Sequence, residues 1–463
     1  MVVVSAPGKI LLVGGYLVLE EENAGLVVAV DKRFYCECKP SSNAADGEEQ
    51  RSTIHVESPQ FGTNWTYGWK NLRIEQQHQK ESDSASPRNV FLEKTLAVIA
   101  LYLDWPSKGL DLSLRVAADN DFYSLVPHLR ERKLQLNQGD DLPPCLSAAR
   151  DDEGRVYKTG LGSSACLVTA VTGAVLQQQG GGQLDCHQLC SLAQIAHCFA
   201  QGKVGSGFDV SAAVYGSHVY RRFPQRLITD LLVQLEQNED CGMALRELVD
   251  ASQKSTLGCG VQAPVCAFTD SSLLQVIMAD VTGGSESPSM ARKVLKWKKE
   301  NTSTQIPHWG DLAALNPEIV KVLEQIRNTS ASASTIEFLA KSHSKDWVSI
   351  DPSVGSLLVK LRQGLVSSRR NLKAMGDAAG VPIEPDVATT LCDATGNLPG
   401  VVAAVVPGAG GYDAVACVMV NHPSVRQAVA AHWAATTSIT VCALTVKGVD
   451  YDNGVRIEPG FPV

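Results

Sequence analysis

The feature that most constrains this 463-residue chain is a glycine-rich turn that leads directly into an apolar helix. The turn reads Lys158-Thr-Gly-Leu-Gly-Ser-Ser-Ala165, and the helix is predicted over residues 164–178. Glycine adopts positive φ and lets the backbone approach a ligand closely. The first N–H groups of a helix are unpaired, and the helix dipole favours an anion there. The pattern fits either a phosphate-binding loop, with a Ser163 or Ser164 hydroxyl available to a phosphate-bound Mg²⁺, or an ordinary glycine turn with a serine N-cap.

The composition is that of a globular protein and excludes several classes of partner. Hydrophobic residues make up 44% of the chain and charged residues 19%, which excludes an intrinsically disordered chain. Lys and Arg number 41 against 49 Asp and Glu, so the net charge is −8. We therefore expect no nucleic-acid partner and no binding to anionic membranes. We also expect no membrane span, because no uninterrupted apolar run reaches the roughly 18 residues that a membrane helix needs.

The cysteines and the two chain ends predict a cytoplasmic location. The 13 cysteines are scattered and contain no Cys-x-x-Cys pair, so we expect reduced thiols and no structural zinc. The apolar start lacks a basic segment and a cleavage site, and Pro7-Gly-Lys9 interrupts it, which indicates a first strand and turn rather than a signal peptide. The last residues, Phe461-Pro-Val463, do not form a peroxisomal tripeptide.

Strand-like and helix-like segments are mixed along the chain, which predicts an α+β protein of two domains. Short strands are predicted at residues 2–6 and 10–13, and a long charged connection is predicted at 127–158. A change in composition near residue 224 places the boundary there, giving domains 1–223 and 224–463.

Three further glycine-containing segments place polar residues beside apolar strands or helices. They are Pro7-Gly-Lys-Ile-Leu-Leu-Val-Gly-Gly-Tyr16, Gln201-Gly-Lys-Val-Gly-Ser-Gly-Phe-Asp209 and Pro407-Gly-Ala-Gly-Gly-Tyr-Asp413. Considered alone, Asp209 fits a turn-capping carboxylate as well as a group that faces phosphates. Lys9 alone likewise fits a solvated lysine as well as a catalytic one. Their combination with the turn at 158–165 favours a functional site.

Other nucleotide-binding patterns do not fit. Gly160-x-Gly-x-x-Ala165 resembles the dinucleotide fingerprint, but the preceding residues 149–159 are charged where that fingerprint needs a buried strand. The segment from Gly408 to Asp413 follows a buried strand but has Asp413 in place of the third glycine. The chain contains no GxxxxGK[ST] and neither HRD nor DFG, which excludes a P-loop NTPase and a protein kinase.

Taken together and in this order, the segments resemble the three motifs of the GHMP kinases, which include galactokinase, homoserine kinase, mevalonate kinase and phosphomevalonate kinase. Motif one is Ala6-Pro-Gly-Lys-Ile-Leu11, motif two is Gly160-Leu-Gly-Ser-Ser-Ala165 and motif three is Gly408-Ala-Gly-Gly411. Within that family, the segments Ser5–Leu19, Gln201–Asp209, Ser58–Phe61 and Pro288–Leu295 are similar to the eukaryotic-type phosphomevalonate kinases.

The resemblance implies an N-terminal domain of ribosomal-S5-like type and a C-terminal ferredoxin-like domain, with the site between them. It implies transfer of the γ-phosphoryl group of ATP to 5-phosphomevalonate, with ADP and 5-diphosphomevalonate as products, in isoprenoid precursor synthesis. The expected cofactors and partners are ATP, Mg²⁺ and the acceptor, and the expected state is a monomer or a homodimer.

The resemblance also assigns roles to residues of this chain. Lys9 and Asp209 line the transfer site, and Ser164 is the expected Mg²⁺ ligand. The ATP phosphates are expected to contact Lys158, Gly160, Leu161, Gly162, Ser163, Ser164 and Ala165. The acceptor is expected to contact Lys203, Ser289, Arg292, Lys293, Gly410 and Gly411, with motif three also supporting motif one.

Two alternatives and one departure from the family pattern accompany this hypothesis. The chain fits a different small-molecule GHMP kinase, such as mevalonate kinase, less well because Gly14-Gly-Tyr16 replaces the Gly-Glu-His of many relatives. A ligand sensor without transfer activity is expected to lack Lys9, Asp209 or a motif-two serine, and all are present. The departure is the helix at residues 193–201, which has no carboxylate where mevalonate kinases carry a metal-binding glutamate, and whose His197 is expected to be a packed histidine.

Overall fold

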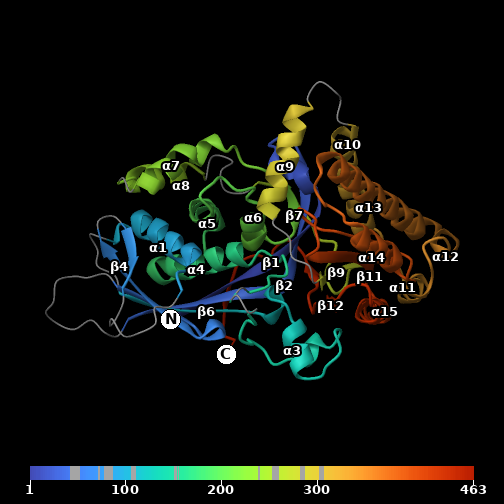
Figure 1. Ribbon diagram of the computed structural model, residues 1–463, viewed down its shortest axis with the longest axis horizontal. Coiled ribbons are helices and arrows are strands. Elements are labelled where there is room, and N and C mark those ends of the chain that lie inside the picture. The colour runs from blue at the N-terminus through green and yellow to red at the C-terminus, as the bar shows by residue number, and fades with distance from the viewer. Residues whose placement is uncertain are drawn as a thin grey trace.

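The protein contains two β-sheets that are flanked by helices and lie side by side (Figure 1). A computed structural model describes residues 1–41, 53–70, 73–77, 87–105, 111–150, 154, 156–237, 240–252, 260–281, 287–301 and 307–462. The predicted α+β class with two differently built halves is confirmed.

The first sheet contains ten of the described strands. Seven follow one another in the order β14 (Arg456–Glu458), β1 (Val2–Val13), β2 (Ala24–Pro40), β6 (Leu112–Ala118), β3 (Thr53–Ser58), β4 (Thr63–Lys70) and β5 (Arg73–Gln76). The remaining three are β7 (His218–Arg221) and β13 (Gly448–Val449), which pair with β2, and β8 (Val261–Pro264), which pairs with β7. Pairing is antiparallel except between β3 and β6. The sheet is therefore organised around the long strand β2.

β1 is one continuous strand, so the prediction of two short strands with a turn between them is wrong. The register of β1 against β2 shifts between Pro7 and Lys9, which marks a β-bulge or irregularity. Such irregularities re-aim the next side chain without ending the strand. Gly8 lies at this point, where a Cβ atom would come within 3.2 Å of the Leu161 carbonyl oxygen. The glycine therefore permits the close approach of the turn at 158–165.

Helices cover this sheet in two layers (Figure 1). α4 (Ser163–Gly180) and α6 (Phe208–Tyr215) pack on β1 and β2, with α1 (Val90–Leu103) and α5 (Cys186–Gln201) beside α4. α5 begins at an Asp185 N-cap, whose carboxylate accepts from the His187 and Gln188 N–H groups, and it ends at Gly202 in the left-handed conformation. The outer layer is formed by α7 (Arg226–Gln237) and α8 (Gly242–Ser252), which pack on α1 and α5.

The second sheet is antiparallel, in the order β12 (Val441–Ala443), β9 (Leu274–Val281), β11 (Ala414–Val420) and β10 (Val401–Val405). Along the chain, its strands and the helices between them follow the β-α-β-β-α-β pattern of a ferredoxin-like unit, as predicted. Its helices are α9 (Ser287–Glu300), α10 (Pro307–Arg327), α11 (Ala333–Lys341), α12 (Trp347–Ile350), α13 (Pro352–Ala379), α14 (Asp386–Gly396) and α15 (Pro423–Ala434).

The chain passes from the first sheet to the second between Pro264 and Leu274, later than the boundary predicted at residue 224. The reason is that α7 and α8 bury apolar side chains such as Ile228 and Leu245 in the same core as α1 and α5. The change in composition near residue 224 therefore marks the start of an outer helical layer.

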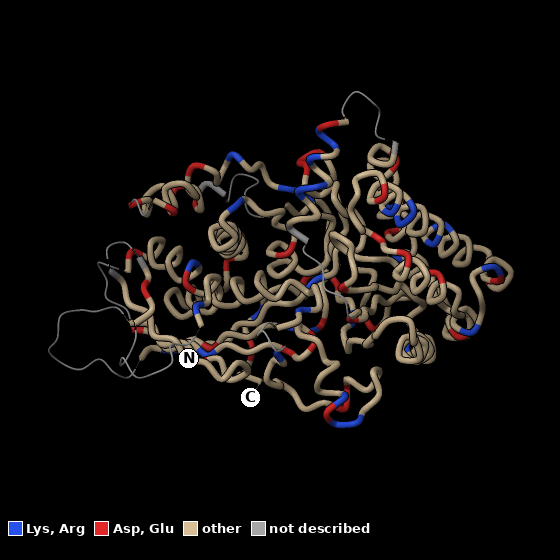
Figure 2. The backbone as a smooth tube through the Cα atoms, in the orientation of Figure 1, with Lys and Arg blue, Asp and Glu red and all other residues tan. Residues whose placement is uncertain are grey.

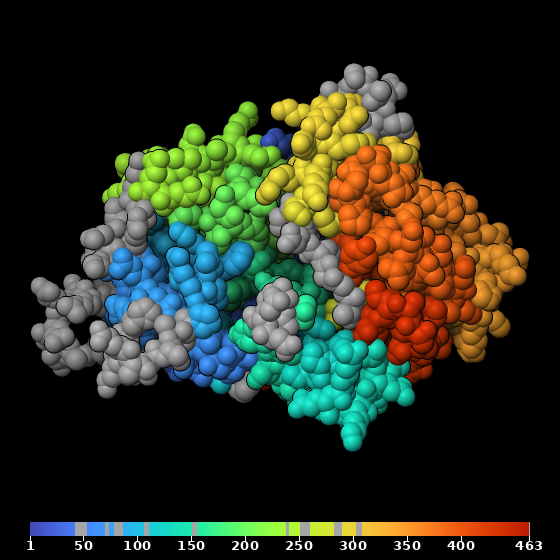
Figure 3. All heavy atoms as spheres, in the orientation of Figure 1, coloured from blue at the N-terminus to red at the C-terminus, as the bar shows by residue number. Residues whose placement is uncertain are grey.

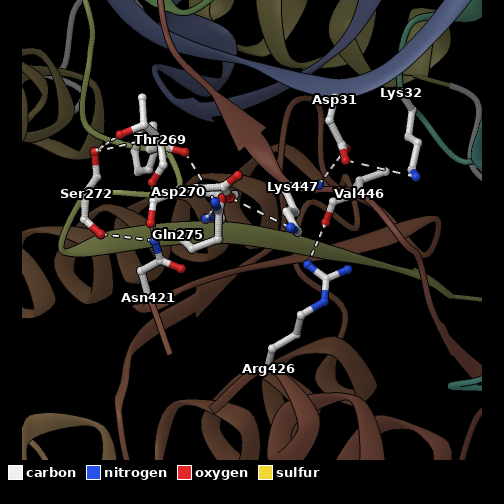
Figure 4. Close-up of polar contacts among 12 residues, drawn as sticks. Asp31, Lys32, Thr269, Asp270, Ser272, Gln275, Asn421, Arg426, Val446 and Lys447 are labelled. Atoms are coloured by element: carbon white, nitrogen blue, oxygen red, sulfur yellow. Dashed lines mark hydrogen bonds and ion pairs between the residues drawn. The ribbon is translucent and has the colours of Figure 1, made fainter. Parts of the chain in front are cut away.

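The end of the chain returns to the first sheet. Asp31 of β2 donates its N–H to the Lys447 carbonyl at 2.9 Å, and its carboxylate accepts the Lys447 N–H at 2.8 Å (Figure 4). Arg426 of α15 donates to the Val446 carbonyl at 3.2 Å in the same view. β14 then pairs with β1. The two halves are thus joined by backbone pairing as well as by side chains.

The connection predicted at 127–158 contains local structure in its described part. It holds most of α3 (Val126–Glu131) and the 3-10 turn η4 (Gly139–Asp141); the other 3-10 turns are η1 (Gly15–Leu19), η2 (Pro59–Phe61) and η3 (Asn120–Phe122). Within the described ranges, no helix is both long and apolar enough to cross a bilayer. No disulfide joins two of the described cysteines.

A buried carboxylate joins the connection before α3 to the second sheet. The Asp280 side chain on β9 accepts a hydrogen bond from the Ser124 hydroxyl at 2.5 Å, and Asp280 is only 6% exposed. Burial raises the pKa of Asp280 from its ordinary value of 3.8 to about 6, and the nearby Asp413 charge adds to this rise. The folded state therefore favours the protonated form of this carboxyl group.

This shift predicts a pH dependence of stability with a defined sign. Because the folded protein holds the Asp280 proton more tightly than the unfolded chain, the contribution of Asp280 to the free energy of unfolding is favourable below about pH 4. That contribution is lost as pH rises through about 6, by up to about 3 kcal/mol. We expect Asp280→Asn to destabilise less at pH 7 than at pH 4, measured by denaturant unfolding at both values. The control is Asp270→Asn, because the Asp270 side chain is highly exposed. We expect this control to change the free energy of unfolding by the same small amount at pH 4 and at pH 7. An equal effect of Asp280→Asn at both values contradicts the prediction.

Candidate functional site

Lys9 lies directly against the glycine-rich turn. Its Nζ donates to the Gly160 carbonyl at 2.7 Å, and its backbone N–H donates to the Leu161 carbonyl at 3.0 Å. The Cys166 thiol at the start of α4 donates to the Pro7 carbonyl at 3.1 Å. Motifs one and two, about 150 positions apart in the sequence, are therefore joined by a side chain and by the backbone.

The turn itself has the conformation of an anion-binding helix start. Gly160 and Gly162 have φ values of +81° and +82°, which side chains rarely adopt. Gly162 is the N-cap of α4 and no side chain caps the helix, so the alternative of a serine N-cap is wrong. The first N–H groups of α4 are thus left for a ligand. Ser163 and Ser164 form the first turn of the helix and are partly exposed.

Asp209 reaches the same place from the start of α6. A Cβ atom on Gly162 would lie 3.1 Å from Lys9 Cε and 3.8 Å from Asp209 Cβ, so the three residues surround one point. The Asp209 Oδ1 atom accepts from the Val210 N–H at 3.0 Å, which leaves Oδ2 directed elsewhere. The structure therefore brings together the lysine, the turn and the aspartate that the sequence singled out.

The loop before Asp209 is fixed by two residues that sequence reasoning missed. Arg222 donates to the carbonyls of Val204 at 3.1 Å and Gly205 at 2.7 Å. Gln194 on α5 donates to the Gly207 carbonyl at 2.6 Å. Arg222 is 8% exposed, so its charge is held by backbone dipoles in the interior. A basic residue shortly after the glycine-rich loop is the sequence signal that was available for Arg222.

Burial disfavours the charged form of Lys9, and a bound phosphate would offset this effect. Burial lowers the pKa of Lys9, and the Asp209 carboxylate opposes this shift by favouring the ammonium form. The Phe208 ring lies beneath the ammonium, with Nζ 5.6 Å from the ring centre. An anionic ligand beside Nζ would stabilise the charged form further.

His197 lies within the site, so the expectation of a merely packed histidine is incomplete. Its Nε2 atom is 3.1 Å from the Ser164 hydroxyl oxygen and 3.9 Å from Asp209 Oδ2. Burial lowers the pKa of His197, the Asp209 charge raises it, and the Lys158 charge lowers it again. Lys158 is exposed at the other end of the turn, where its backbone forms an isolated antiparallel β-bridge with Tyr123. The spacing of His197 and Gln201, one turn apart at the end of α5, was the available signal.

Motif three contacts motif one. The Gly408 N–H donates to the Leu11 carbonyl at 3.0 Å, and the Tyr16 hydroxyl donates to the Ala409 carbonyl at 2.6 Å. The Gly411 N–H donates to the Ile383 carbonyl at 2.9 Å, and a Cβ on Gly410 would come within 2.1 Å of that same oxygen. Gly410 and Gly411 are buried. Motif three thus supports the strand that carries Lys9.

The remaining acceptor candidates lie on more open surfaces. Lys203 is exposed at the end of α5, and Arg292 and Lys293 are exposed on α9, while Ser289 is partly buried. α9 packs with its apolar residues Met290 and Val294 in a cluster shared with η1, α10 and α13. Figure 3 places α9 at the junction of the N-terminal and C-terminal parts. In the described part of the chain, no hydrogen bond or ion pair joins Arg292 or Lys293 to Lys9 or Asp209.

The charged residues of the molecule are not gathered into an all-protein metal cage. Across the described ranges, no group of three or more His, Cys, Asp or Glu residues fits a metal ion. Figure 2 shows Lys, Arg, Asp and Glu spread over helices and loops, with few in the central strands. The oxygen atoms of Ser164 and Asp209 are the hard ligands that Mg²⁺ prefers, and Mg²⁺ commonly takes its other ligands from phosphates and water. The site therefore fits a metal that arrives with a phosphate ligand.

The comparisons agree with these motifs. The family model described as the GHMP kinases N terminal domain matches residues 155–217, which include motif two and Asp209. Phosphomevalonate kinase of Candida albicans is 34% identical over 90% of this chain and 89% of its own length. A peroxisomal phosphomevalonate kinase of Arabidopsis thaliana is 33% identical over 100% of this chain and 97% of its own length.

Solved structures share the fold. Phosphomevalonate kinase of Streptococcus pneumoniae, in complex with phosphomevalonate and AMPPNP, has a TM-score of 0.57 at 15% identity and covers 97% of this chain and 100% of its own. The Lin0012 protein of Listeria innocua has a TM-score of 0.61 at 16% identity, with 99% of both chains covered. Both share the two-sheet architecture described above.

The lack of a side chain at Gly162 predicts a specific effect of substitution. Gly162→Ala places a methyl group 3.1 Å from Lys9 Cε at a positive φ, so it strains the turn and displaces the ammonium. Gly181→Ala is the matched control, because Gly181 ends the same helix with φ +52° and has no atom within 4 Å of its added Cβ. We expect each variant to lose about 1–2 kcal/mol in the free energy of unfolding. Only Gly162→Ala is expected to weaken the binding of an ATP analogue, by about tenfold or more in calorimetry. Equal nucleotide affinity of the two variants contradicts the role assigned to Gly162.

Proposed function

This chain belongs to the phosphomevalonate kinase family of GHMP kinases, and from that premise we propose how its residues carry out the reaction. It is a phosphotransferase that moves the γ-phosphoryl group of ATP to 5-phosphomevalonate and releases ADP and 5-diphosphomevalonate. The observation that carries the proposed site is the meeting of Lys9, the turn at 160–164 and Asp209 around Gly162. The first N–H groups of α4 and the loop backbone hold the ATP phosphates.

The main obstacle to this reaction is repulsion between two anionic substrates. An oxygen of the acceptor phosphate attacks the γ-phosphorus, a new P–O bond forms, and the bond to the ADP oxygen breaks. Lys9 neutralises charge where the two phosphates meet, and the exposed ammonium of Lys203 assists the acceptor. The Ser164 hydroxyl would help to hold a Mg²⁺ ion bound to the ATP phosphates, and such an ion would offset further phosphate charge. The protein thus works by positioning and electrostatics.

Asp209 holds the cation rather than removing a proton. The acceptor is a phosphate monoester whose second pKa is about 6, so its attacking oxygen is ionised at pH 7 without a base. Burial lowers the pKa of Lys9, and the Asp209 carboxylate opposes this shift by favouring the ammonium form. This role is supported by the approach of Lys9 and Asp209 to the same side of Gly162.

The roles of the acceptor residues and the location of the protein complete the proposal. Ser289, Arg292 and Lys293 on α9 guide the acceptor phosphate, supported by the place of α9 at the junction of the two halves (Figure 3). Gly410 and Gly411 form the acceptor side of motif three, whose Gly408 N–H bonds to the Leu11 carbonyl of motif one. The free thiols of the described cysteines support a reducing compartment such as the cytosol, where the chain works as a monomer or homodimer.

A comparison of acceptors tests the reaction. With ATP and Mg²⁺, we expect kcat/KM for 5-phosphomevalonate to exceed that for mevalonate by at least about a hundredfold, because the site is built to hold a second phosphate. A coupled assay of ADP release measures both rates, and Lys9→Met is the inactive control. A preference for mevalonate points to another small-molecule GHMP kinase, and nucleotide binding without any transfer points to a sensor; either result contradicts the proposal.

The pH dependence of Asp209→Asn tests the role of the carboxylate. We expect kcat to fall by about a hundredfold, because Lys9 loses its partner and the phosphates are held less well. The acidic limb of kcat/KM near pH 6 is expected to stay in the variant, since it reports ionisation of the acceptor phosphate. Loss of an acidic limb in Asp209→Asn, relative to the unsubstituted protein, identifies Asp209 as a general base and contradicts the proposal.

A further inference from the structure

We propose that His197 is a positioning residue, which holds the Ser164 hydroxyl and the Asp209 carboxylate in the orientation needed for phosphoryl transfer. The proposal rests on the function proposed above and concerns a residue that the motifs do not include. The His197 Nε2 atom lies between α4 and α6. It is 3.1 Å from Ser164 Oγ on α4 and 3.9 Å from Asp209 Oδ2 on α6. One ring nitrogen on α5 is therefore within hydrogen-bond distance of Ser164 and lies next to the Asp209 carboxylate.

The imidazole is itself held in place by two further neighbours, an aromatic ring and an amide side chain. His197 is 2% exposed, and the Phe91 ring on α1 lies against it with 5.5 Å between ring centres. The Gln201 side chain, one turn further along α5, lies 3.3 Å and 3.4 Å from the two ring nitrogens. Because the ring is packed on an apolar neighbour and contacted by an amide, its orientation is fixed before a ligand binds.

The two residues that His197 contacts need such a restraint. A serine hydroxyl has three staggered rotamers, which direct its oxygen to different places, so a partner that selects one of them fixes where the hydroxyl points. The described hydrogen-bond partner of Ser164 Oγ is His197. The Asp209 Oδ1 atom accepts from the Val210 N–H, and the imidazole lies 3.9 Å from Oδ2, so the ring limits the space into which the carboxylate can turn. Loss of His197 is therefore expected to loosen both groups without changing their charge.

The chain contains a second buried serine–histidine pair that serves as a matched control. The Ser211 hydroxyl and His218 Nε2 are 2.9 Å apart, and His218 Nδ1 is 2.9 Å from the Gly216 carbonyl. His218 is fully buried on β7. Its two ring nitrogens thus contact Ser211 in α6 and the Gly216 C-cap of α6, neither of which is assigned a role in the transfer.

The first experiment compares substitutions of His197 that differ in reach. His197→Gln places an amide near the former Nε2 position, whereas His197→Asn reaches only as far as Nδ1 and His197→Phe keeps the ring without nitrogen. We expect kcat to fall by about ten- to a hundredfold in the Phe and Asn variants, with KM for the acceptor changed by less than about threefold. The Gln variant is expected to recover most of kcat. His218→Gln is expected to lower Tm and to leave kcat within about twofold. Equal activity of the Gln and Asn variants overturns the proposal.

The second experiment asks whether His197 acts through Ser164. If it does, His197→Phe adds little to the loss already caused by Ser164→Ala, so the double variant has nearly the kcat of Ser164→Ala alone. A purely structural role of His197 predicts losses that multiply, and that result overturns the proposal.

A binding measurement separates this proposal from the proposed function. The rise in Tm caused by an ATP analogue is measured with and without Mg²⁺ for the unsubstituted protein, Ser164→Ala and His197→Phe. We expect both substitutions to reduce the Mg²⁺-dependent part of the rise and to leave the metal-free part unchanged. An unchanged Mg²⁺-dependent part in His197→Phe overturns the role of His197 while transfer by the unsubstituted protein continues. Absence of transfer to 5-phosphomevalonate by the unsubstituted protein overturns the proposed function, and this inference with it.

Discussion

The site depends on the hydrogen bond between the Lys9 ammonium and the Gly160 carbonyl, which joins a strand to the turn before α4. A partly desolvated ammonium is unfavourable unless polar groups surround it. Here a carbonyl dipole, an aromatic face and the Asp209 carboxylate hold it in place. The irregularity in β1 and the missing side chain at Gly162 allow this approach. The same ammonium is then available to phosphates without a large rearrangement, which is the condition for electrostatic preorganisation.

The three glycine motifs differ in the parts of the structure that they contact. Motifs one and two meet each other directly, whereas motif three packs behind motif one and reaches the second sheet. Its contact is with the Ile383 carbonyl, and the next residue, Glu384, forms a buried ion pair with Arg369 of α13 at 3.2 Å. Removing one partner of such a pair leaves an uncompensated charge, so the segment 381–385 is firmly placed. Through it, the second half of the molecule fixes the strand that carries Lys9.

The sequence predicts those parts of the structure whose signals are local. Glycine positions and apolar periodicity predict the turn at 158–165 and the helix that follows it, whereas the ferredoxin-like order of elements follows only from the resemblance to the GHMP kinases. The continuous β1 could not be predicted, because Pro7-Gly-Lys9 is a turn signal that strand pairing on β2 overrides. The place of α7 and α8 on the first layer, and the contact of His197 with Ser164, arise only when distant segments pack together. The secondary-structure propensity of a segment does not predict which distant residues it will contact.

The chemistry of the acceptor accounts for the neutral residues that face Lys9 and Asp209. An alcohol acceptor gains from a strong base, but a phosphate acceptor is already ionised at pH 7 and adds its charge to that of ATP. Each further carboxylate at the site would repel both substrates, while a neutral imidazole and an amide orient neighbouring groups without adding negative charge. The end of α5 carries His197 and Gln201, which lie against each other, and Asp209 is the acid beside His197. Neutral side chains that orient the reacting groups and cations that offset phosphate charge thus act together in joining two anions.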